Sequence, residues 1–234
     1  MIVLVVGTGT DVGKTHITCC LLAARRGSPL RISAFKPVLT GAGPAMGSGS
    51  EAADAPTDVD AHARWLDVRP PPPLFAFSPP VSPHLAARLA GVVLSVEDIA
   101  DHAATLAASF DLLLVETAGG LFSPIGETTT SADLAAALVR RGGLRVLLVA
   151  PDRVGVLHDL RATLWAAHHV GLTVHGVVLS APASPDATTG TNAAEATTLG
   201  TTSVAAVFPR AAPDDPASLE AASRTFQALK LDGT

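Results

Sequence analysis

Aromatic side chains are scarce in this chain of 234 residues, which contains no tyrosine and only two tryptophans. Hydrophobic residues nevertheless make up 48% of the sequence and charged residues only 16%, which excludes disorder as a description of the whole chain. The core therefore has to be built from alanine, valine and leucine. Such a core is common where helices pack closely on a parallel β-sheet.

Cysteine is nearly absent as well. The two cysteines, Cys19 and Cys20, are adjacent, and neither has another cysteine with which to pair. A structural disulfide is therefore not expected, and a reducing, cytoplasmic compartment fits best. The chain also lacks the succession of basic segment, apolar segment and cleavage site that marks a secretory signal, so we do not expect secretion.

Two further absences concern partners. No apolar stretch approaches the roughly 18 residues of a membrane-spanning helix, so no membrane partner is expected. Lysine and arginine number 16 against 21 aspartates and glutamates, which gives a formal charge of −5, and no basic stripe is visible. Nucleic acid is therefore not expected as a partner either.

The sequence does show a regular alternation of short apolar runs and helical patterns. Continuous apolar strands separated by helices favour a mostly parallel sheet that is covered on both faces. We therefore predict a doubly wound α/β fold of the phosphate-loop type, formed by residues 1–234 as a single domain. The expected strands are 2–6, 31–36, 111–115, 144–149, 173–179 and 204–207, and the expected helices are 13–25, 131–140, 156–170 and 216–229.

Three segments interrupt this alternation. Residues 41–57 are small, polar and rich in glycine and proline, so we expect them to be mobile. Residues 70–83 begin with consecutive prolines, which predicts a stiff, extended connection. Residues 181–202 are rich in alanine, threonine, glycine and proline, and we expect a long loop there with room for one helical turn.

The strongest motif is Gly7-Thr-Gly-Thr-Asp-Val-Gly13-Lys14-Thr15, which lies between a buried strand and a helix. In such a loop the backbone N–H groups can face a phosphate, and the helix N-terminus adds the positive end of its dipole. Lys14 can reach the β- and γ-phosphates, and the Thr15 hydroxyl can ligate Mg²⁺. The spacing from Gly7 to Gly13 is one residue longer than in the strict pattern. The alternative, a glycine-rich turn with a solvated lysine, is disfavoured by the position between strand and helix.

Polar residues that are candidates for the functional site also follow two more predicted strands. Glu116 follows the apolar run Leu112–Val115, and ligands of open α/β sheets lie at the carboxyl ends of strands. An acid there can hold Mg²⁺ or be merely solvated, and the nearby phosphate loop favours the metal role. Lys36 could neutralise charge on a transferred phosphoryl group or be an ordinary surface lysine, and the Thr40 hydroxyl could donate to the same oxygens.

Together these motifs resemble those of a known family. GTGTDVGKT, KPVLTG, SPHLAA and VETAGGLFSPI follow one another as in the dethiobiotin synthetases of biotin biosynthesis, and the similarity extends from Met1 to about Leu179. Similar phosphate loops occur in MinD/ParA-like regulatory ATPases and in cobyrinate-amidase-like enzymes, which are the alternatives. A MinD/ParA-like loop usually has a second lysine at its beginning, where this chain has Thr8, Gly9 and Thr10.

The resemblance implies a reaction and a set of residues for it. ATP, with Mg²⁺, would drive the carboxylation of 7,8-diaminopelargonate by CO₂ or bicarbonate and its closure to dethiobiotin, through a carbamate and a carbamic–phosphoric anhydride. Cations and Mg²⁺ suit such chemistry because they spread anionic charge. By resemblance, the catalytic residues are Lys14, Lys36 and Thr10, and the nucleotide-binding residues are Gly9, Thr10, Asp11, Val12, Gly13, Lys14, Thr15, Glu116 and Gly119.

The metal ligands implied by the resemblance are Thr15, Glu116 and an aspartate that opens a helix after the segment 41–57. Asp60 suits that family pattern best, since it is followed by alanine, and Asp58 is the alternative. Asp54 is a third candidate, within the glycine-rich segment. Any of these aspartates could instead be a helix N-cap.

The resemblance also implies a homodimer with the substrate at its interface. Lys36 and Thr40 would bind the reacting end of the diamine. Its far carboxylate would bind a helix N-terminus of the second subunit, where free N–H groups and the helix dipole favour an anion. The alternative is a helix start without a ligand. The matching residues of this chain are Gly155, Val156, Leu157 and His158.

The chain departs from the family pattern at three places. Ser180-Ala181-Pro182 stands where the family often has an Asn-Asp pair that reads adenine, so the selectivity for the base is in doubt. Thr117 replaces a usual glycine, and His158 replaces a frequent asparagine. The histidine keeps a hydrogen-bond donor at the helix start but could make it depend on pH.

Overall fold

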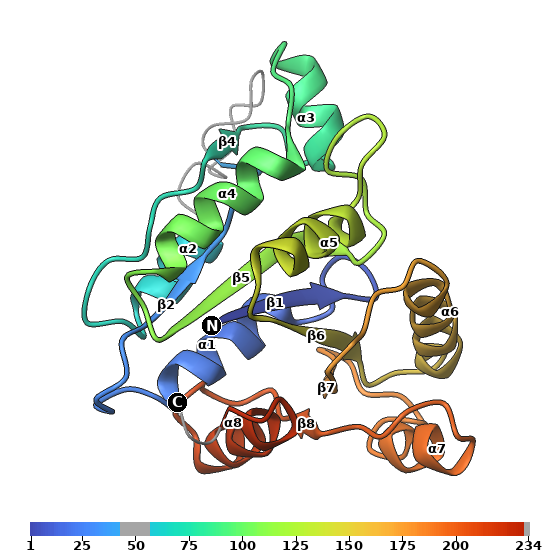
Figure 1. Cartoon of the computed structure of the whole chain (residues 1–234). Coiled ribbons are helices and arrows are strands. Elements are labelled where there is room, and N and C mark those ends of the chain that lie inside the picture. Colours follow the sequence, from blue (N-terminus) through green and yellow to red (C-terminus); the bar gives the residue numbers. More distant parts are fainter. Residues whose placement is uncertain (43–56, 232–234) are drawn as a thin grey trace, which may run out of the picture.

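The computed structural model describes residues 1–42 and 57–231. Its centre is a six-stranded sheet in the order β2-β5-β1-β6-β7-β8 (Figure 1), and all neighbouring strands are parallel. The predicted doubly wound α/β fold is thereby confirmed. The strands of this sheet are β1 (Ile2–Gly7), β2 (Ile32–Phe35), β5 (Leu112–Gly120), β6 (Leu144–Pro151), β7 (Gly176–Ser180) and β8 (Ala206–Phe208).

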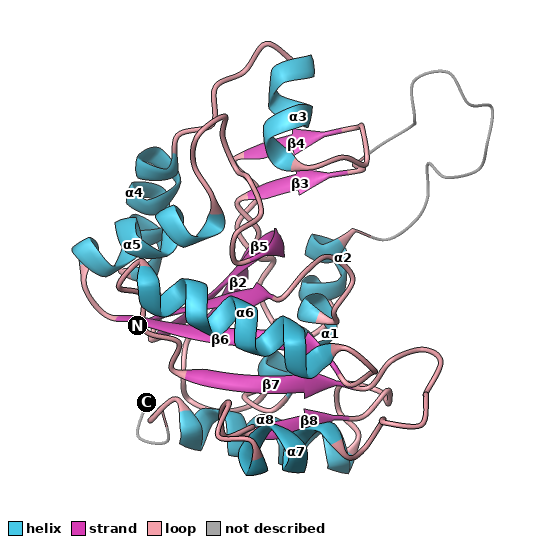
Figure 2. Cartoon of the chain, turned by 90° about the vertical axis from the view of Figure 1, so that its right-hand side faces the viewer, coloured by secondary structure: helices cyan, strands magenta, loops and turns pink. Residues whose placement is uncertain are grey.

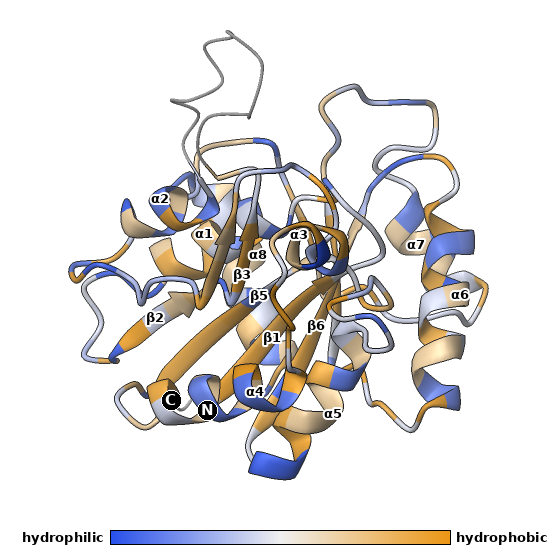
Figure 3. Ribbon diagram, turned by 90° about the horizontal axis from the view of Figure 1, so that it is seen from above, coloured by the Kyte–Doolittle hydropathy of each residue, from blue (hydrophilic) through white to orange (hydrophobic). Residues whose placement is uncertain are grey.

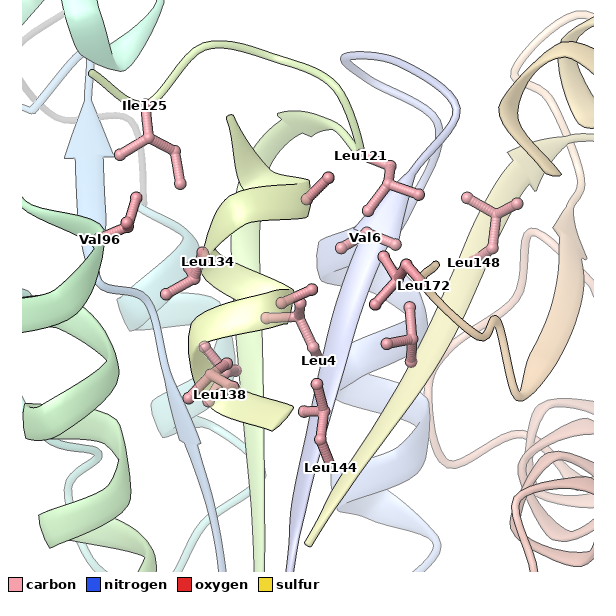
Figure 4. Packing of buried hydrophobic residues seen from close by; sticks show 14 of the residues in the cluster. Leu4, Val6, Val96, Leu121, Ile125, Leu134, Leu138, Leu144, Leu148 and Leu172 are labelled. Carbon is pink, nitrogen blue, oxygen red and sulfur yellow. The ribbon is translucent and has the colours of Figure 1, made fainter. Parts of the chain in front are cut away.

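The central strand β1 is buried on both faces. Leu4 and Val6 belong to one hydrophobic cluster and Val3 and Val5 to another, because successive side chains of a strand point to opposite faces. Figure 4 shows the first cluster, in which side chains of β1 lie among leucines of β6 and of a covering helix. Figure 3 accordingly colours most of the length of the central strands as hydrophobic. This burial explains the continuous apolar runs of the sequence.

Helices cover both faces of the sheet. The first cluster includes residues of α4 (Val96–Ala107), α5 (Ser131–Arg141) and α6 (Val156–His169), and the second includes residues of α1 (Lys14–Ala23) and α8 (Pro216–Ala228). Side chains close the starts of several helices. The Ser95 hydroxyl accepts from Asp98 N at α4, and the Asp215 carboxylate accepts from Ala217 N at α8. Within the described residues, no helix has both the length and the apolar character needed to cross a membrane.

The smaller elements lie beside this sheet. A two-stranded parallel sheet of β3 (Val38–Thr40) and β4 (Phe75–Phe77) lies next to α3 (Pro83–Leu89), away from α7 (Asn192–Thr198) and α8 (Figure 2). The chain also forms α2 (Asp58–Ala63). The helix α2 lies where the resemblance implied a helix opened by an aspartate, and α7 exceeds the single turn expected. The elements β3, β4, α3 and α4 were not predicted. The predicted mobility of residues 41–57 falls mostly on 43–56, which lie outside the described residues.

The carboxyl end of β5 is irregular, and this irregularity brings it to the phosphate loop. Val5 of β1 pairs with Glu116, but Gly7 pairs with Gly120, so β5 has additional residues between the two pairs. A Cβ atom on Gly120 would lie 3.1 Å from Gly9 N. The close approach of these two segments of the backbone therefore favours a glycine at position 120.

Candidate nucleotide-binding and catalytic site

The phosphate loop runs from the end of β1 to the start of α1. Gly13, the N-cap of α1, has a left-handed backbone with φ of 96°, and Asp11 also has a positive φ of 55°. These conformations leave backbone N–H groups of the loop without hydrogen-bond acceptors in the backbone of the described residues. Within the part of the chain that the structure describes, no backbone N–H of residues 9–14 forms a backbone hydrogen bond. The loop therefore presents several free N–H groups at a helix N-terminus, which is the arrangement that binds phosphate.

Two buried lysines face this loop in different electrostatic states. Lys14 is 6% exposed and donates from Nζ to Gly9 O at 3.0 Å. Burial, and then the positive charge of Lys36, lower the pKa of Lys14 to about 8. Burial also acts to lower the pKa of Lys36, but the carboxylates of Glu116 and Asp58 outweigh it and raise that pKa. Lys36 is thus held as a cation, whereas Lys14 can lose its proton at mildly alkaline pH.

Glu116 is the most completely buried acid of the site and accepts four hydrogen bonds. Its Oε1 accepts from Thr15 Oγ1 and from Lys36 Nζ, both at 2.8 Å. Its Oε2 accepts from Thr18 Oγ1 and from His62 Nε2, both at 2.9 Å. Burial acts to raise the pKa of Glu116, but Lys36 and His62 outweigh it and hold that pKa well below its usual range. The carboxylate is therefore ionised and fixed in orientation.

The aspartate that reaches this cluster is Asp58, and the prediction that Asp60 would do so is wrong. Asp58 Oδ1 lies 2.8 Å from Thr15 Oγ1, whose single hydrogen cannot be donated to Asp58 and Glu116 at once, and Asp58 Oδ2 lies 2.7 Å from Lys36 Nζ. Asp60 is exposed and accepts from Thr57 N at 3.0 Å and from Thr57 Oγ1 at 2.6 Å. The first of these bonds and the bond from Asp60 N to Thr57 Oγ1 at 3.2 Å form a capping box at the start of α2. The two bonds from Thr57 to the Asp60 carboxylate lower the pKa of Asp60. Asp54 lies outside the described residues.

Three oxygen atoms therefore meet at one point: Thr15 Oγ1, Asp58 Oδ1 and Glu116 Oε1. Oxygen donors of this kind fit Mg²⁺. Among the described residues, no group of three or more histidine, cysteine or acidic side chains is arranged to hold a metal ion. A magnesium ion at this point would accordingly take its other ligands from water and phosphate, as Mg²⁺ commonly does.

A cavity of about 650 Å³ opens onto this cluster. It unites most of the residues that the sequence placed in the site, together with Ser82 and Pro83 of the motif SPHLAA. The predicted site residues that line it are Thr10, Asp11, Gly13, Lys14, Thr15, Lys36, Thr40, Glu116 and Gly119. Gly9, Val12 and the four residues at the start of α6 do not line it.

A second cavity, of about 450 Å³, adjoins the first and shares the phosphate loop with it. Its other walls come from Ser180–Ala183 after β7 and from Arg153 and Arg210. Aspartates hold the surrounding loops by accepting from the backbone: Asp152 from Gly190 N and Asp186 from Val154 N, both at 2.8 Å. This cavity lies where the sugar and base of a nucleotide would extend from phosphates bound at the loop.

Thr18 and His62, both completely or almost completely buried, were not predicted as members of the site. The signal for Thr18 is a polar residue one helical turn after Lys14, between the apolar residues Ile17 and Cys19. The signal for His62 is its position four residues after Asp58, which places both side chains on one face of α2. A single histidine or threonine in a sequence does not indicate a functional site unless the residue that it contacts is known.

The fold and the phosphate loop define a P-loop nucleotide-binding protein. A family model described as an AAA domain matches residues 2–217. The MinC:MinD cell division protein complex of Aquifex aeolicus has a TM-score of 0.57 at 11% identity, over 100% of this chain and 97% of that chain. A ParA family ATPase from Chlorobium tepidum TLS has a TM-score of 0.53 at 14% identity, over 99% and 92%. At such identities the likeness concerns the fold alone.

Curated relatives narrow this class to one family. The ATP-dependent dethiobiotin synthetase BioD of Caulobacter vibrioides (strain NA1000 / CB15N) is 37% identical over 178 residues, 75% of this chain and 78% of the relative. The protein of the same name from Anaeromyxobacter sp. (strain Fw109-5) is 37% identical over 182 residues, 78% of this chain and 77% of the relative. The chain belongs to the dethiobiotin synthetase family, a family of ATP-dependent ligases, and the resemblance of its motifs is confirmed.

Proposed function

We propose that this chain is a single-domain, cytoplasmic ligase that uses ATP and Mg²⁺ to convert 7,8-diaminopelargonate and CO₂ to dethiobiotin, ADP and phosphate. Membership of the family supports this reaction. In the structure, the observation that supports it best is the pair of buried lysines, Lys14 and Lys36, on the cavity that also holds Glu116. Two cations beside a phosphate loop suit a reaction that accumulates negative charge on a transferred phosphoryl group.

The proposed reaction has three steps. One amine of the diamine takes up CO₂ and loses a proton, which gives a carbamate. A carbamate oxygen attacks the γ-phosphorus of ATP, the bond to the bridging oxygen breaks, and ADP leaves with that electron pair. The second amine then attacks the carbonyl carbon of the carbamic–phosphoric anhydride, loses a proton and expels phosphate, which closes the cyclic urea. No step needs a covalent link to the protein, so the protein contributes position and charge.

The residues divide this work. The free N–H groups of the loop bind the phosphates, and Lys14 turns from Gly9 O towards the β- and γ-phosphates. Lys36 faces the carbamate and the transferred phosphoryl group, and the hydroxyls of Thr10 and Thr40 line the same cavity. Thr15, Asp58 and Glu116 would hold Mg²⁺, which supplies positive charge to the phosphate oxygens.

We propose further that the start of α6 binds the far carboxylate of the diamine in a neighbouring subunit of a homodimer. Gly155 caps this helix with φ of 90°, and residues 155–158 line neither cavity of their own chain. Val156 N and His158 N donate within the helix start, but Leu157 N forms no backbone hydrogen bond in the described part of the chain. A free N–H at a helix N-terminus can receive a carboxylate from outside the chain.

Leu157→Pro tests this substrate site, because proline lacks the N–H but is tolerated in the first turn of a helix. Loss of one charge-assisted hydrogen bond costs about 1.5–3 kcal/mol, so KM for the diamine should rise by about 10- to 150-fold. The affinity for ATP should not change. An equal mixture of Leu157→Pro and Lys14→Ala subunits should have about a quarter of its active sites intact if subunits exchange at random, because each site takes Lys14 from one subunit and the start of α6 from the other. An active enzyme that is strictly monomeric by light scattering would refute the shared site.

The reaction itself is tested by incubating the protein with 7,8-diaminopelargonate, bicarbonate and MgATP, and by detecting dethiobiotin by mass spectrometry. Phosphate release should require both the diamine and bicarbonate. Phosphate release that proceeds equally without them would contradict the proposal and is the result expected of a MinD/ParA-like regulatory ATPase.

A further inference from the structure

His62 is buried against the site but does not line its cavity. Its side chain is 1% exposed, and its Nε2 lies 2.9 Å from Glu116 Oε2. An ionised carboxylate can only accept hydrogen bonds, so Nε2 must carry the hydrogen and donate it. A buried polar side chain with so short a contact to the central acid of the site has a role beyond filling space.

We infer that His62 is a positioning residue that fixes Glu116 and, through it, the aspartate carried by α2. This inference rests on the proposed function, since it concerns the same acid. It assigns no contact with the substrate to the histidine. Its first part concerns the orientation of Glu116, and its second part concerns the attachment of α2.

The orientation of the Glu116 carboxylate depends on the different hydrogen-bond donors that surround its two oxygens. Oε1 faces residues that line the cavity, Thr15 and Lys36, whereas Oε2 faces the interior and has Thr18 and His62 as partners. Two donors behind a carboxylate prevent its rotation, so Oε1 stays directed at the cavity. With His62 removed, only the Thr18 hydroxyl would hold the interior oxygen.

The attachment of α2 depends on the same contact. Asp58 and His62 are four residues apart on this helix of six residues, and both reach the centre formed by Thr15, Lys36 and Glu116. Asp58 is at the beginning of the helix and remains partly exposed, with a side-chain exposure of 32%. His62 is the deeper of the two contacts. It therefore anchors the helix that brings Asp58 to the proposed metal ligands.

The test compares two amides of different reach. A glutamine amide can take the position of the histidine Nε2, whereas an asparagine amide ends about one bond short of it. His62→Asn should raise the Mg²⁺ concentration for half-maximal rate, and lower kcat, by about tenfold or more, because a charge-assisted bond is lost. KM for the diamine should stay within about threefold. His62→Gln should stay within about threefold of the wild type in all three quantities.

A second measurement needs neither substrate nor metal. Trp65 follows α2, donates from its backbone N to His62 O at 3.0 Å, and packs partly against the second cluster. With Trp165 replaced by phenylalanine, Trp65 is the only tryptophan left, so its quenching by acrylamide reports whether α2 is attached. His62→Asn should raise the quenching constant roughly twofold, as expected for local opening, and His62→Gln should not.

Two control variants distinguish the proposed positioning role of His62 from a general effect of the substitution on the stability of the protein. His175→Gln alters another histidine, which accepts from Val146 N near the amino end of β6, and should change none of these quantities. Thr18→Val removes the other donor to Oε2 without touching α2, so it should lower kcat but leave Trp65 quenching unchanged. Equal behaviour of His62→Asn and His62→Gln, whether both are impaired or both are normal, would overturn the inference. If the wild-type protein makes no dethiobiotin, the proposed function fails, but the Trp65 quenching still tests the role of His62. Failure of the proposed function and failure of this inference can therefore be distinguished.

Discussion

The two cavities that meet at the phosphate loop are built in different ways. Around the larger cavity, the buried Lys36 is paired with both the buried Glu116 and the partly exposed Asp58. Around the smaller one, Arg153 lies 3.8 Å from Asp159, and Arg210 has no ion pair within the described residues. Buried charges depend on their partners, whereas exposed charges are screened by solvent. Substitutions should therefore have large effects on the side of the larger cavity and small effects on the other.

The largest effect is expected from Lys14→Ala. It removes a cation from the phosphates both in binding and in the transition state, so turnover should fall below about a tenth of the wild-type rate. Dethiobiotin formation measures it. Lys230→Ala, at the other end of the chain, is the matched control and should keep its activity. Substantial turnover by Lys14→Ala would contradict the assignment of the phosphate loop.

Glu116→Gln should have the next largest effect. The amide keeps the shape of the side chain but removes the charge that three donors and Lys36 surround. The Mg²⁺ concentration for half-maximal rate should rise by about tenfold or more. Glu127→Gln, at an exposed pair with Arg88, is the control. An unchanged Mg²⁺ titration would remove Glu116 from the metal ligands.

The pH dependence of ATP binding should show a moderate effect. The pKa of Lys14 is lowered to about 8, so the free enzyme carries this charge below that pH and loses it above. The dissociation constant for ATP should be constant below about pH 7 and should increase, by up to about tenfold per pH unit, above pH 8. Titrations between pH 6.5 and 9.5 measure this. Lys14→Arg, whose guanidinium keeps its charge, should show no increase, and a flat wild-type profile would contradict the role of burial.

The smallest effect is expected from a change of base. Ser180-Ala181-Pro182 offers no side-chain amide to adenine, and Arg153 and Arg210 present only donors. GTP or CTP should therefore support turnover within about tenfold of ATP. Initial rates with each nucleotide measure this. Strict dependence on ATP would mean that backbone groups of the loop after β7 read adenine, and the contrast between the cavities would then disappear.

Much of the fold could be predicted because the strands are buried on both faces. Residues 2–6, 112–115 and 144–149 are continuous apolar runs, and the structure places them side by side in one sheet. The helix α4 was not predicted although it is long, because it is rich in alanine and acidic residues and contains no continuous apolar run. The short elements β3, β4 and α3 have too few residues to show a period.

The candidate site was predictable where residues follow a strand directly. Lys36 directly follows β2, Glu116 lies in the neighbouring strand β5, and Lys14 begins the helix that follows the next strand, β1. The three residues therefore line one cavity at the same edge of the sheet. The choice of Asp60 failed because it followed a family pattern. The local pattern Thr57-x-x-Asp60 indicated a capping box instead. His62 could not be predicted from its own residue type, since its role arises from a neighbour 54 positions away.

The contact between Gly13 and β7 has a consequence for how this protein can vary. A Cβ on Gly13 would lie 2.3 Å from Ser180 Oγ, and the left-handed φ of Gly13 already disfavours a side chain. The two positions should therefore be epistatic: substitutions at both should not have additive effects. A side chain at position 13 is therefore accessible only together with a change at Ser180, which couples variation in the phosphate loop to variation at the end of β7.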